Sequence, residues 1–411
     1  MESIAAIDIG STKALTLIVD VDEKGNTRVV STGSSPCRGL KRGTVNDIEE
    51  TAQAVVNSVR RCEQMAGRKI NNVVISVTGE HIQGQNSKGI IPLIPPHRTI
   101  TREDVNRVIN HSKQIVLPSD RELIHALPRA FKVDSQDGIE RPFGMSGERL
   151  EVSTHLVHGQ ITHIQNLERC VNRAQIEVDQ VVFSPIASGL AVLEPNEIES
   201  GVLLLDIGGG TTDIALYTEG SLAFSATIPV GSGHITSDIS KLLKTSREEA
   251  ERLKISSGSC LPDNIGKGEV VAVTQLGMDS PRPFPRSVLA EIITARVDEI
   301  LYLVSELLEK SGFALRQVSG CVLTGGGSKL TGLSQMAEKT LNGIPTRIGT
   351  PKQLGGLSDM VSGPEHATAV GLVLHELKMR EEKTVSAEVG DWRRFFAPLK
   401  TLFGTKAGTN K

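Results

Sequence analysis

Residues 204–213 read LLDIGGGTTD, and this stretch decides the fold that we expect for the 411-residue chain. An apolar run delivers Asp206 to a turn of three glycines and two threonines, and a second apolar run follows at 214–217. Glycine has no Cβ, so a turn of this kind can bring backbone N–H groups against a phosphate. The pattern predicts a phosphate-binding β-hairpin in which Asp206 offers a hard oxygen ligand to a metal such as Mg²⁺.

A variant of the same pattern lies near the N-terminus, where residues 6–13 read AIDIGSTK and an apolar strand follows at 14–19. Asp8 takes the place of Asp206, and Gly10, Ser11 and Thr12 take the place of the glycine turn. Taken alone, a strand followed by a glycine is usually an ordinary turn. Two such hairpins in one chain predict a duplicated architecture that clamps a nucleotide between its halves.

A third glycine turn, GGGS at 325–328, follows an apolar strand at 320–324. We expect a helix after it, with Leu330 and Leu333 on its apolar face. A helix that begins at a glycine loop favours anions through its dipole and its free N–H groups. Three loops of this kind, each at the end of a strand, favour a nucleotide site over three unrelated turns.

The composition excludes several classes of protein. Charged residues make up 23% of the chain and the net charge is −3, so no basic excess points to nucleic acid. The five cysteines are scattered and form no C-x-x-C pair, which favours reduced thiols over zinc or disulfides. No apolar run reaches the roughly 18 residues of a membrane span, and no signal peptide is expected because the N-terminus enters a core strand at once.

The order of the expected elements indicates two α/β domains. Strands and a helix alternate over 1–83, and this first domain resumes at 166–198. Between them, 84–165 contains a helix that begins at Thr101 with Asp104 as a capping partner, set among turn-rich extended segments. We interpret it as an inserted subdomain. The second domain covers 199–377, with a smaller lobe at about 232–312, and the polar segment 378–390 is expected to be a flexible linker.

Four stretches carry a resemblance to a known family: 75–82 (ISVTGEHI), 120–128 (DRELIHALP), 137–147 with DGI and PFGMSG, and the C-terminal tail. They are similar to the FtsA family of bacterial cell-division proteins, which belongs to the actin, sugar-kinase and heat-shock chaperone superfamily. The resemblance implies an actin-like ATPase fold: two related α/β domains around a nucleotide cleft, with a small α+β subdomain inserted in the first.

The resemblance also implies a set of residues that bind ATP and Mg²⁺. Asp8 and Asp206 would hold Mg²⁺ through waters, and no catalytic base can be assigned, so we expect at most a weak ATPase in which the nucleotide switches assembly. Glu251 and Lys254, three apart on one helix, would contact the nucleoside, although a surface ion pair is the ordinary interpretation. The full expected set on the two phosphate loops and the adenosine loop is Gly10, Ser11, Thr12, Lys13, Gly208, Gly209, Gly210, Thr211, Thr212, Gly326, Gly327 and Ser328.

The C-terminal segment 391–404 is amphipathic at the helical period of roughly 3.6 residues. Its apolar positions fall within about 120° of a helical wheel, and its basic positions lie off that stripe. This pattern favours a helix that lies in an anionic membrane surface over a helix docked on its own domain. Pro398 would kink it, and 405–411 is expected to be a disordered tail. The expected membrane residues are Trp392, Arg393, Arg394, Phe395, Phe396, Leu399, Lys400, Leu402 and Phe403.

Under the resemblance, the chain would form filaments at the division site on the cytoplasmic face of the plasma membrane. It would bind the C-terminal tail of the tubulin-like FtsZ and recruit later division proteins. Arg296 matches a basic position of the FtsZ groove, and its neighbours Arg286 and Glu299 are weaker candidates. An exposed helix face is the ordinary interpretation. Two alternatives are a small-molecule kinase of the same superfamily and a soluble pilus-assembly adaptor of the PilM kind. The amphipathic tail speaks against both.

Overall fold

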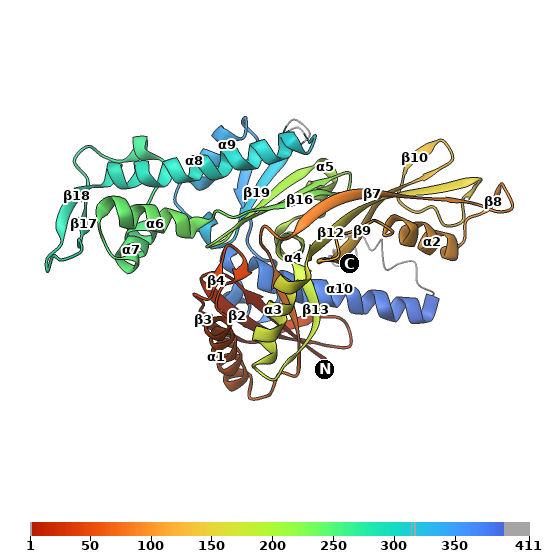
Figure 1. The fold of residues 1–411 in the computed structure, drawn as a ribbon, viewed down its shortest axis with the longest axis horizontal. Coiled ribbons are helices and arrows are strands. Elements are labelled where there is room, and N and C mark those ends of the chain that lie inside the picture. The colour runs from red at the N-terminus through yellow and green to blue at the C-terminus, as the bar shows by residue number, and fades with distance from the viewer. Residues whose placement is uncertain (1, 314, 316–317, 390–411) are drawn as a thin grey trace, which may run out of the picture.

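The computed structural model describes residues 2–313, 315 and 318–389. Two α/β domains lie side by side, and two smaller parts extend from them in opposite directions along the longest axis (Figure 1). At one end lies the lobe that contains α6, α7 and the β17–β18 hairpin, and at the other lies the subdomain that contains β8, β10 and α2. The expected membrane helix at 391–404 and the tail at 405–411 lie outside the described residues.

The first domain is built on a six-stranded sheet of order β13-β6-β1-β2-β3-β21. Its centre is the antiparallel hairpin of β1 and β2, and β6 lies parallel to β1. Helix α1 begins where the Asp47 side chain accepts from Glu50 N and ends at Gly67, whose φ is 67°, as its sequence predicts. The elements are β1 Glu2–Ile9, β2 Lys13–Val21, β3 Thr27–Pro36, β4 Leu40–Lys41, β5 Thr44–Val45, α1 Ile48–Ala66, β6 Asn72–Val77, α3 Ile161–Asn172, β13 Glu177–Phe183, α4 Ser184–Val192, α5 Pro195–Ser200 and β21 Gly355–Gly356.

The second domain repeats this plan in a five-stranded sheet of order β16-β15-β14-β19-β20. Strands β14 and β15 form an antiparallel hairpin, as β1 and β2 do. Strand β14 lies parallel to β19, as β1 does to β6. The two sheets therefore share one strand order, and the predicted duplication is confirmed. The elements are β14 Val202–Ile207, β15 Thr212–Thr218, β16 Ser221–Ile228, β19 Gly320–Thr324, the 3₁₀ helix η3 Gly326–Lys329, α9 Leu333–Thr340 and β20 Thr346–Ile348.

The smaller lobe of the second domain is mostly helical. Its long helix buries an apolar stripe that includes Leu289, Ile293, Val297 and Leu301 against the second-domain core. The elements are α6 Ser232–Leu243, α7 Arg247–Ser257, β17 Val270–Val273, β18 Arg282–Pro285 and α8 Arg286–Lys310.

The inserted subdomain leaves the first domain after β6 and returns at α3. Its four-stranded sheet has the order β10-β9-β12-β7, and its own small core includes Ile100, Val105, Ile109 and Phe131. The prediction of an inserted α+β subdomain is confirmed, although α3 begins earlier than the helix near residue 166 that the sequence indicates. The elements are β7 Gln83–Pro92, β8 Arg98–Thr99, α2 Arg102–Ser112, β9 Arg121–Val133, β10 Gln136–Ile139, β11 Ser146–Gly147 and β12 Arg149–Gln160.

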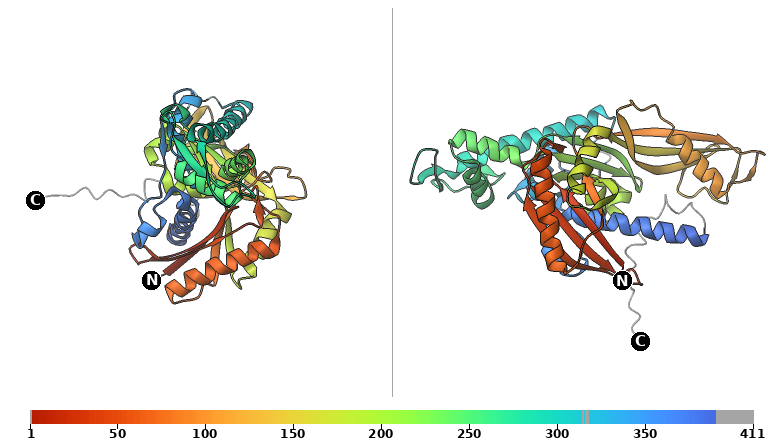
Figure 2. Two further views of the ribbon diagram at one scale, coloured as in Figure 1. Left: turned by 90° about the vertical axis from the view of Figure 1, so that its left-hand side faces the viewer. Right: turned by 60° about the horizontal axis from the view of Figure 1, so that its bottom comes forward.

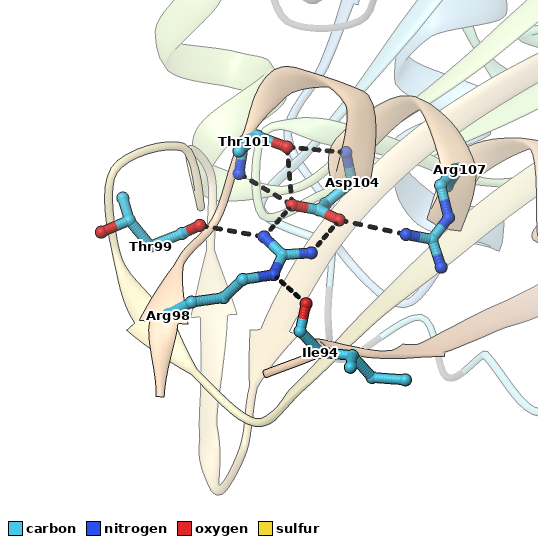
Figure 3. Close-up of polar contacts among 6 residues, drawn as sticks. All are labelled: Ile94, Arg98, Thr99, Thr101, Asp104 and Arg107. Atoms are coloured by element: carbon cyan, nitrogen blue, oxygen red, sulfur yellow. Dashed lines mark hydrogen bonds and ion pairs between the residues drawn. The ribbon is translucent and has the colours of Figure 1, made fainter. Parts of the chain in front are cut away.

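One buried carboxylate joins the loop before α2 to the helix itself (Figure 3). Asp104 is 2% exposed and receives two hydrogen bonds of 2.6 Å from the Arg98 guanidinium. It also accepts from the backbone N–H and the hydroxyl of Thr101, at 2.9 and 2.7 Å, which completes the predicted capping box. Arg107 adds a contact of 3.3 Å. The hydrogen bonds from Arg98 hold the pKa of Asp104 well below its usual range.

Asp104→Asn is therefore expected to destabilise the subdomain by about 3 kcal/mol, because it removes the buried partner of the Arg98 guanidinium, which is itself 24% exposed. The folded-state pKa is depressed, so the carboxylate stabilises the wild type above an ordinary Asp pKa of 3.8 and ceases to do so as the pH falls below it. Hydrogen exchange of β7 and β12 at pH 7 and at about pH 2.5, which lies below the ordinary Asp pKa, measures both effects. Asp137→Asn, on the exposed β10 turn, is the matched control, and equal exchange in the two variants would contradict the prediction.

The last helix, α10, runs Ala367–Val389 and packs on α4 and the first-domain sheet. The right-hand view of Figure 2 shows α10 continuing beyond the first domain, below the inserted subdomain in that view. The prediction of a flexible linker at 378–390 is wrong for 378–389. The segment has no apolar period, but its Lys, Glu, Met and Arg residues favour helix, and Arg380 binds Glu376 at 2.7 Å and Glu2 at 2.6 Å. No helix in the described part of the chain has the length and hydropathy to cross a membrane.

Candidate nucleotide site between the two domains

The two predicted phosphate loops have the same backbone structure and lie opposite each other. Gly10 N donates to Lys13 O at 2.9 Å, and Gly208 N donates to Thr211 O at 2.9 Å. A Cβ on Gly209 would stand 2.3 Å from Thr12 Cγ2, and a Cβ on Gly210 would stand 2.5 Å from the Ser11 hydroxyl. Only glycine permits this approach, so the second loop needs its glycines to face the first one across the domain boundary.

Three carboxylates gather behind these loops. Asp206 and Asp213 are cross-strand partners on β14 and β15 and are 6% and 4% exposed. Burial, followed by the negative charge of Asp8, raises the pKa of Asp206 to about 6, and burial with the charge of Asp206 raises the pKa of Asp213 to about 7. Burial also raises the pKa of Asp8, against the opposing effects of Ser76 and Lys13. The site therefore concentrates negative charge that a cation would stabilise.

Hydroxyl groups fix the orientation of each carboxylate. Ser76 donates to Asp8 Oδ1 at 2.8 Å, and Thr368 at the start of α10 donates to Asp206 Oδ2 at 3.1 Å. Hard oxygen donors of this kind suit Mg²⁺, which usually keeps several of its waters. Among the described residues, no three acidic, histidine or cysteine side chains converge closely enough to ligate one ion directly. The donor set fits the expected water-mediated site of Asp8 and Asp206.

Positive charge lies at the edge of the same loops. Lys13 is partly buried, and its pKa is lowered by burial, while Asp8 and Glu365 act in the opposite sense. Lys329, the last residue of η3, pairs with Glu365 at 2.8 Å. Burial lowers the pKa of the neighbouring His366 to about 4, so this histidine is neutral at physiological pH. Sequence patterns gave no signal for Glu365 and His366, which lie in the turn before α10.

The nucleoside residues expected from the sequence are linked to the second phosphate loop. Lys254 forms a 2.8 Å ion pair with Glu251, and its side chain is only 10% exposed. Its ammonium also donates to Thr236 Oγ1 at 3.0 Å and to Ser232 O at 3.3 Å, and Ser232 N donates to Gly208 O at 2.9 Å. The pair is thus built into the junction of α6 and α7, which a solvated surface pair would not be.

The loop that the resemblance assigns to adenosine packs against the end of β14. A Cβ on Gly327 would stand 2.5 Å from Ile207 Cγ2, at the end of β14, and Ser328 is buried with its hydroxyl on Gly325 O at 2.7 Å. A small apolar pocket connects this loop to α6 and α8. It is lined by Ile207, Ser232, Ile235, Val297, Ile300, Leu301, Gly327, Leu330 and Leu333.

Two residues that the sequence analysis did not assign belong to the site. Asp213 accepts a 2.7 Å hydrogen bond from Thr227 on β16 and a second one from Thr78, which follows β6 in the first domain. Asp213 is the last residue of the stretch 204–213. The expected hairpin could have indicated its role, because hairpin pairing places Asp213 opposite Asp206. Thr78 gave no signal, because its contact bridges 135 positions of sequence.

The residues expected to bind a partner lie on α8. Arg296 donates to Asp238 on α6 at 2.7 Å and also pairs with Glu299, and Arg286 pairs with Glu269 at 2.7 Å. These pairs hold the smaller lobe together, so substitutions here would alter its packing as well as any partner contact. The expected membrane residues, from Trp392 to Phe403, lie outside the described residues.

Known protein families and solved structures resemble the chain. The family model described as cell division protein FtsA matches 203–371, and the model of the SHS2 domain inserted in FtsA matches 79–158. Among solved structures, the PilM–PilN type IV pilus biogenesis complex aligns with a TM-score of 0.64 at 17% identity, covering 91% of this chain and 98% of that chain. MreB5 of Spiroplasma citri bound to ADP aligns with a TM-score of 0.56 at 15% identity, covering 95% and 99%. They show an actin-like fold.

Curated relatives match over nearly the whole chain. The cell division protein FtsA of Pseudomonas aeruginosa is 38% identical over 92% of this chain and 90% of that protein. FtsA of Neisseria meningitidis is 40% identical over 90% and 89%, and FtsA of Escherichia coli K12 is 35% identical over 95% of each. With the duplicated sheets, the facing glycine loops and the inserted subdomain, these matches show that the chain belongs to the FtsA family of cell-division proteins.

Proposed function

We propose that this chain binds ATP with Mg²⁺ in the cleft and assembles on the cytoplasmic membrane into filaments that anchor the FtsZ ring. The observation that carries the proposal is the pair of facing glycine loops backed by the buried carboxylates of Asp8, Asp206 and Asp213. Such a site is complementary to a phosphate chain bridged by a cation. The MreB5 structures with ADP and with AMPPNP, which share the fold, support an adenine nucleotide.

The roles of the residues follow from their positions. Asp8 and Asp206 would hold Mg²⁺ through waters, and Mg²⁺ would neutralise charge on the phosphates. Lys13 supplies a cation beside the first loop, and Gly209 and Gly210 of the second loop lie against that loop. Glu251 and Lys254 would contact the nucleoside from the junction of α6 and α7. We expect turnover to be weak and the nucleotide to act mainly as a switch for assembly.

The C-terminal segment would attach the assembly to the membrane. Its six large apolar side chains would each contribute about 1.5–3 kcal/mol if fully buried, and partial insertion and helix ordering reduce the sum, so one anchor binds reversibly. Several anchors on one filament bind by avidity. Because α10 is helical to Val389, the part after Lys378 acts as a stiff spacer of about 18 Å, at about 1.5 Å per residue.

The smaller lobe would receive the C-terminal tail of FtsZ near Arg286, Arg296 and Glu299, and further division proteins would bind the inserted subdomain. Support for the lobe comes from exposed apolar side chains on the β17–β18 hairpin, which leads directly into Arg286. Val270 is 59% exposed, Leu276 is 68% exposed and Met278 is 42% exposed, all on or beside the β17–β18 hairpin. A short peptide with apolar and acidic side chains would suit this surface.

Co-sedimentation with anionic vesicles in ATP and Mg²⁺ tests the membrane part of the proposal. The full chain is expected to pellet, and a chain that ends at Gly390 is expected to stay in the supernatant. Phe396→Glu and Thr401→Glu add the same charge on opposite faces of the expected helix. Only Phe396→Glu should release the protein, by at least tenfold. Equal pelleting of all four proteins, or equal release by both substitutions, would exclude an amphipathic anchor and leave a soluble ATP-dependent adaptor.

A further inference from the structure

The inserted subdomain belongs to the first domain by sequence but packs against the second. Strand β7 is an edge of the inserted sheet and β16 is an edge of the second-domain sheet, and these two edges meet. Asn86 on β7 donates to Ala223 O on β16 at 3.0 Å. A Cβ on Gly84 would stand 2.5 Å from the Ser225 hydroxyl, so the strands approach as closely as glycine allows. Each sheet therefore covers an exposed edge of the other.

A buried histidine extends this contact into the insert. His155 on β12 is 1% exposed, and its two ring nitrogens contact Ser225 Oγ and Asn86 Oδ1, both at 2.8 Å. Arg129 on β9 reaches Ser221 and Thr218 of the second domain at 3.3 Å. On its other side, the insert is fixed to the first domain, where His125 Nε2 accepts from Phe183 N at 3.0 Å. The subdomain is thus bonded to both domains at once.

The entry to the insert touches the candidate nucleotide site. Thr78, five residues before β7, donates to Asp213 behind the second phosphate loop. Asp213 also accepts from Thr227, which lies on β16 two residues from Ser225. Gly79, the next residue, has a φ of 132° and packs on the backbone of Arg42, whose N–H lies beside Gly210. The chain that leads into the insert therefore contacts residues of both domains beside the second phosphate loop.

We infer that the inserted subdomain responds to a ligand bound between the two domains. A ligand that draws the two phosphate loops together tightens the contact of β7 with β16, and Thr78 transmits the change. The inference rests on the proposed nucleotide binding. A ligand held by loops from both domains stabilises one relative placement of those domains. The insert bonds to both, so its seat depends on that placement. Thr78 is a positioning residue that links Asp213 to the first strand of the insert.

Hydrogen exchange of the full chain with and without ATP and Mg²⁺ tests the inference. In the wild type, the nucleotide should slow exchange at least threefold in the phosphate loops and also in β7 and β16. Asn86→Ala removes the hydrogen bonds of Asn86 to Ala223 and His155. In this variant, the nucleotide should still slow exchange in the phosphate loops, but its effect on β7 should fall below a third of the wild-type effect. Asn110→Ala, an exposed asparagine of α2 in the same subdomain, is the matched control and should behave as the wild type.

Thr78→Val at saturating ATP is the second variant. Thr227→Val is its control, because it removes the other hydroxyl that donates a hydrogen bond to Asp213. Only Thr78→Val should uncouple β7 from the loops. Protected loops with an unresponsive wild-type insert would overturn the coupling and leave the nucleotide site intact. So would full insert responses in both Asn86→Ala and Thr78→Val. If neither loops nor insert respond in the wild type, the proposed nucleotide binding fails and the coupling fails with it.

Discussion

Asp206→Ala is expected to weaken Mg²⁺-dependent ATP binding at least 100-fold, which corresponds to about 2.7 kcal/mol. Asp206 is held at the end of β14 between Asp8, Asp213 and the Thr368 hydroxyl. The raised pKa of Asp206, about 6, arises from burial and from repulsion by Asp8, and a divalent cation would relieve both effects. Without this carboxylate, the cation loses one of the two acidic groups assigned to it. Titration of a fluorescent ATP analogue with Mg²⁺ and with EDTA measures the change.

Asp206→Asn separates charge from shape. It is expected to lose binding as Asp206→Ala does, but to raise the melting temperature of the ligand-free protein at pH 7. The folded-state pKa lies above the ordinary 3.8, so the ionised carboxylate destabilises the fold increasingly as the pH rises from about 4 to about 6. The amide removes that penalty. Unchanged affinity in both variants would contradict the metal assignment, and a lowered melting temperature for Asp206→Asn would contradict the electrostatic argument.

The fold could be predicted from the sequence because its signals are local and repeated. The glycine turns after apolar strands mark both hairpins, and the two sheets share the order that this repetition implies. Helix ends were equally legible. Asp47 and Gly67 bound α1, and Thr101 with Asp104 begins α2, because caps satisfy backbone groups within a few residues of the helix end.

Contacts between distant segments were not predictable in this way. The hydrogen bond from Thr78 to Asp213 and the seat of Asn86 on β16 exist only because the insert folds back over the second domain. Nothing within a few residues of either position indicates where the insert will lie. For the same reason, the sequence could place Arg296 on the outer part of α8 but not its ion pair with Asp238 on α6.

The prediction of a flexible linker at 378–390 failed for a different reason. A helix that leaves the body of its domain has no core-facing stripe, and periodicity detects only such stripes. At 378–389 the helix is favoured by residue propensity and, at its start, by the Glu376–Arg380 pair, which are weaker signals than an apolar face. Polar sequence without a period therefore does not by itself indicate an irregular chain.

The second large effect is expected at Gly371, in the part of α10 that crosses α4. A Cβ on Gly371 would stand 1.8 Å from the carbonyl oxygen of Ala187 and 2.2 Å from its carbon. By helix propensity alone, Gly371→Ala should stabilise the protein by about 1 kcal/mol. The contact reverses the sign, because α10 must move away from α4, and overpacking of this kind costs about 1–3 kcal/mol and occasionally more. Because the obstructing atoms belong to the backbone, we place the cost at the upper end of this range and expect a net loss of about 2 kcal/mol.

The midpoint of urea unfolding, followed by far-UV circular dichroism, measures this loss. Gly320→Ala is the control, because its nearest foreign atom would stand 3.8 Å from the new Cβ, and its effect should stay within about 0.5 kcal/mol. The obstructing atoms belong to the backbone of Ala187, so Ala187→Gly cannot rescue Gly371→Ala, whereas a clash between side chains would be relieved. An unchanged midpoint, or rescue by Ala187→Gly, would mean that α10 and α4 do not approach as closely as the glycine permits. Thr368, three residues before Gly371 on the same helix, binds Asp206, so displacement of α10 should also weaken the metal site.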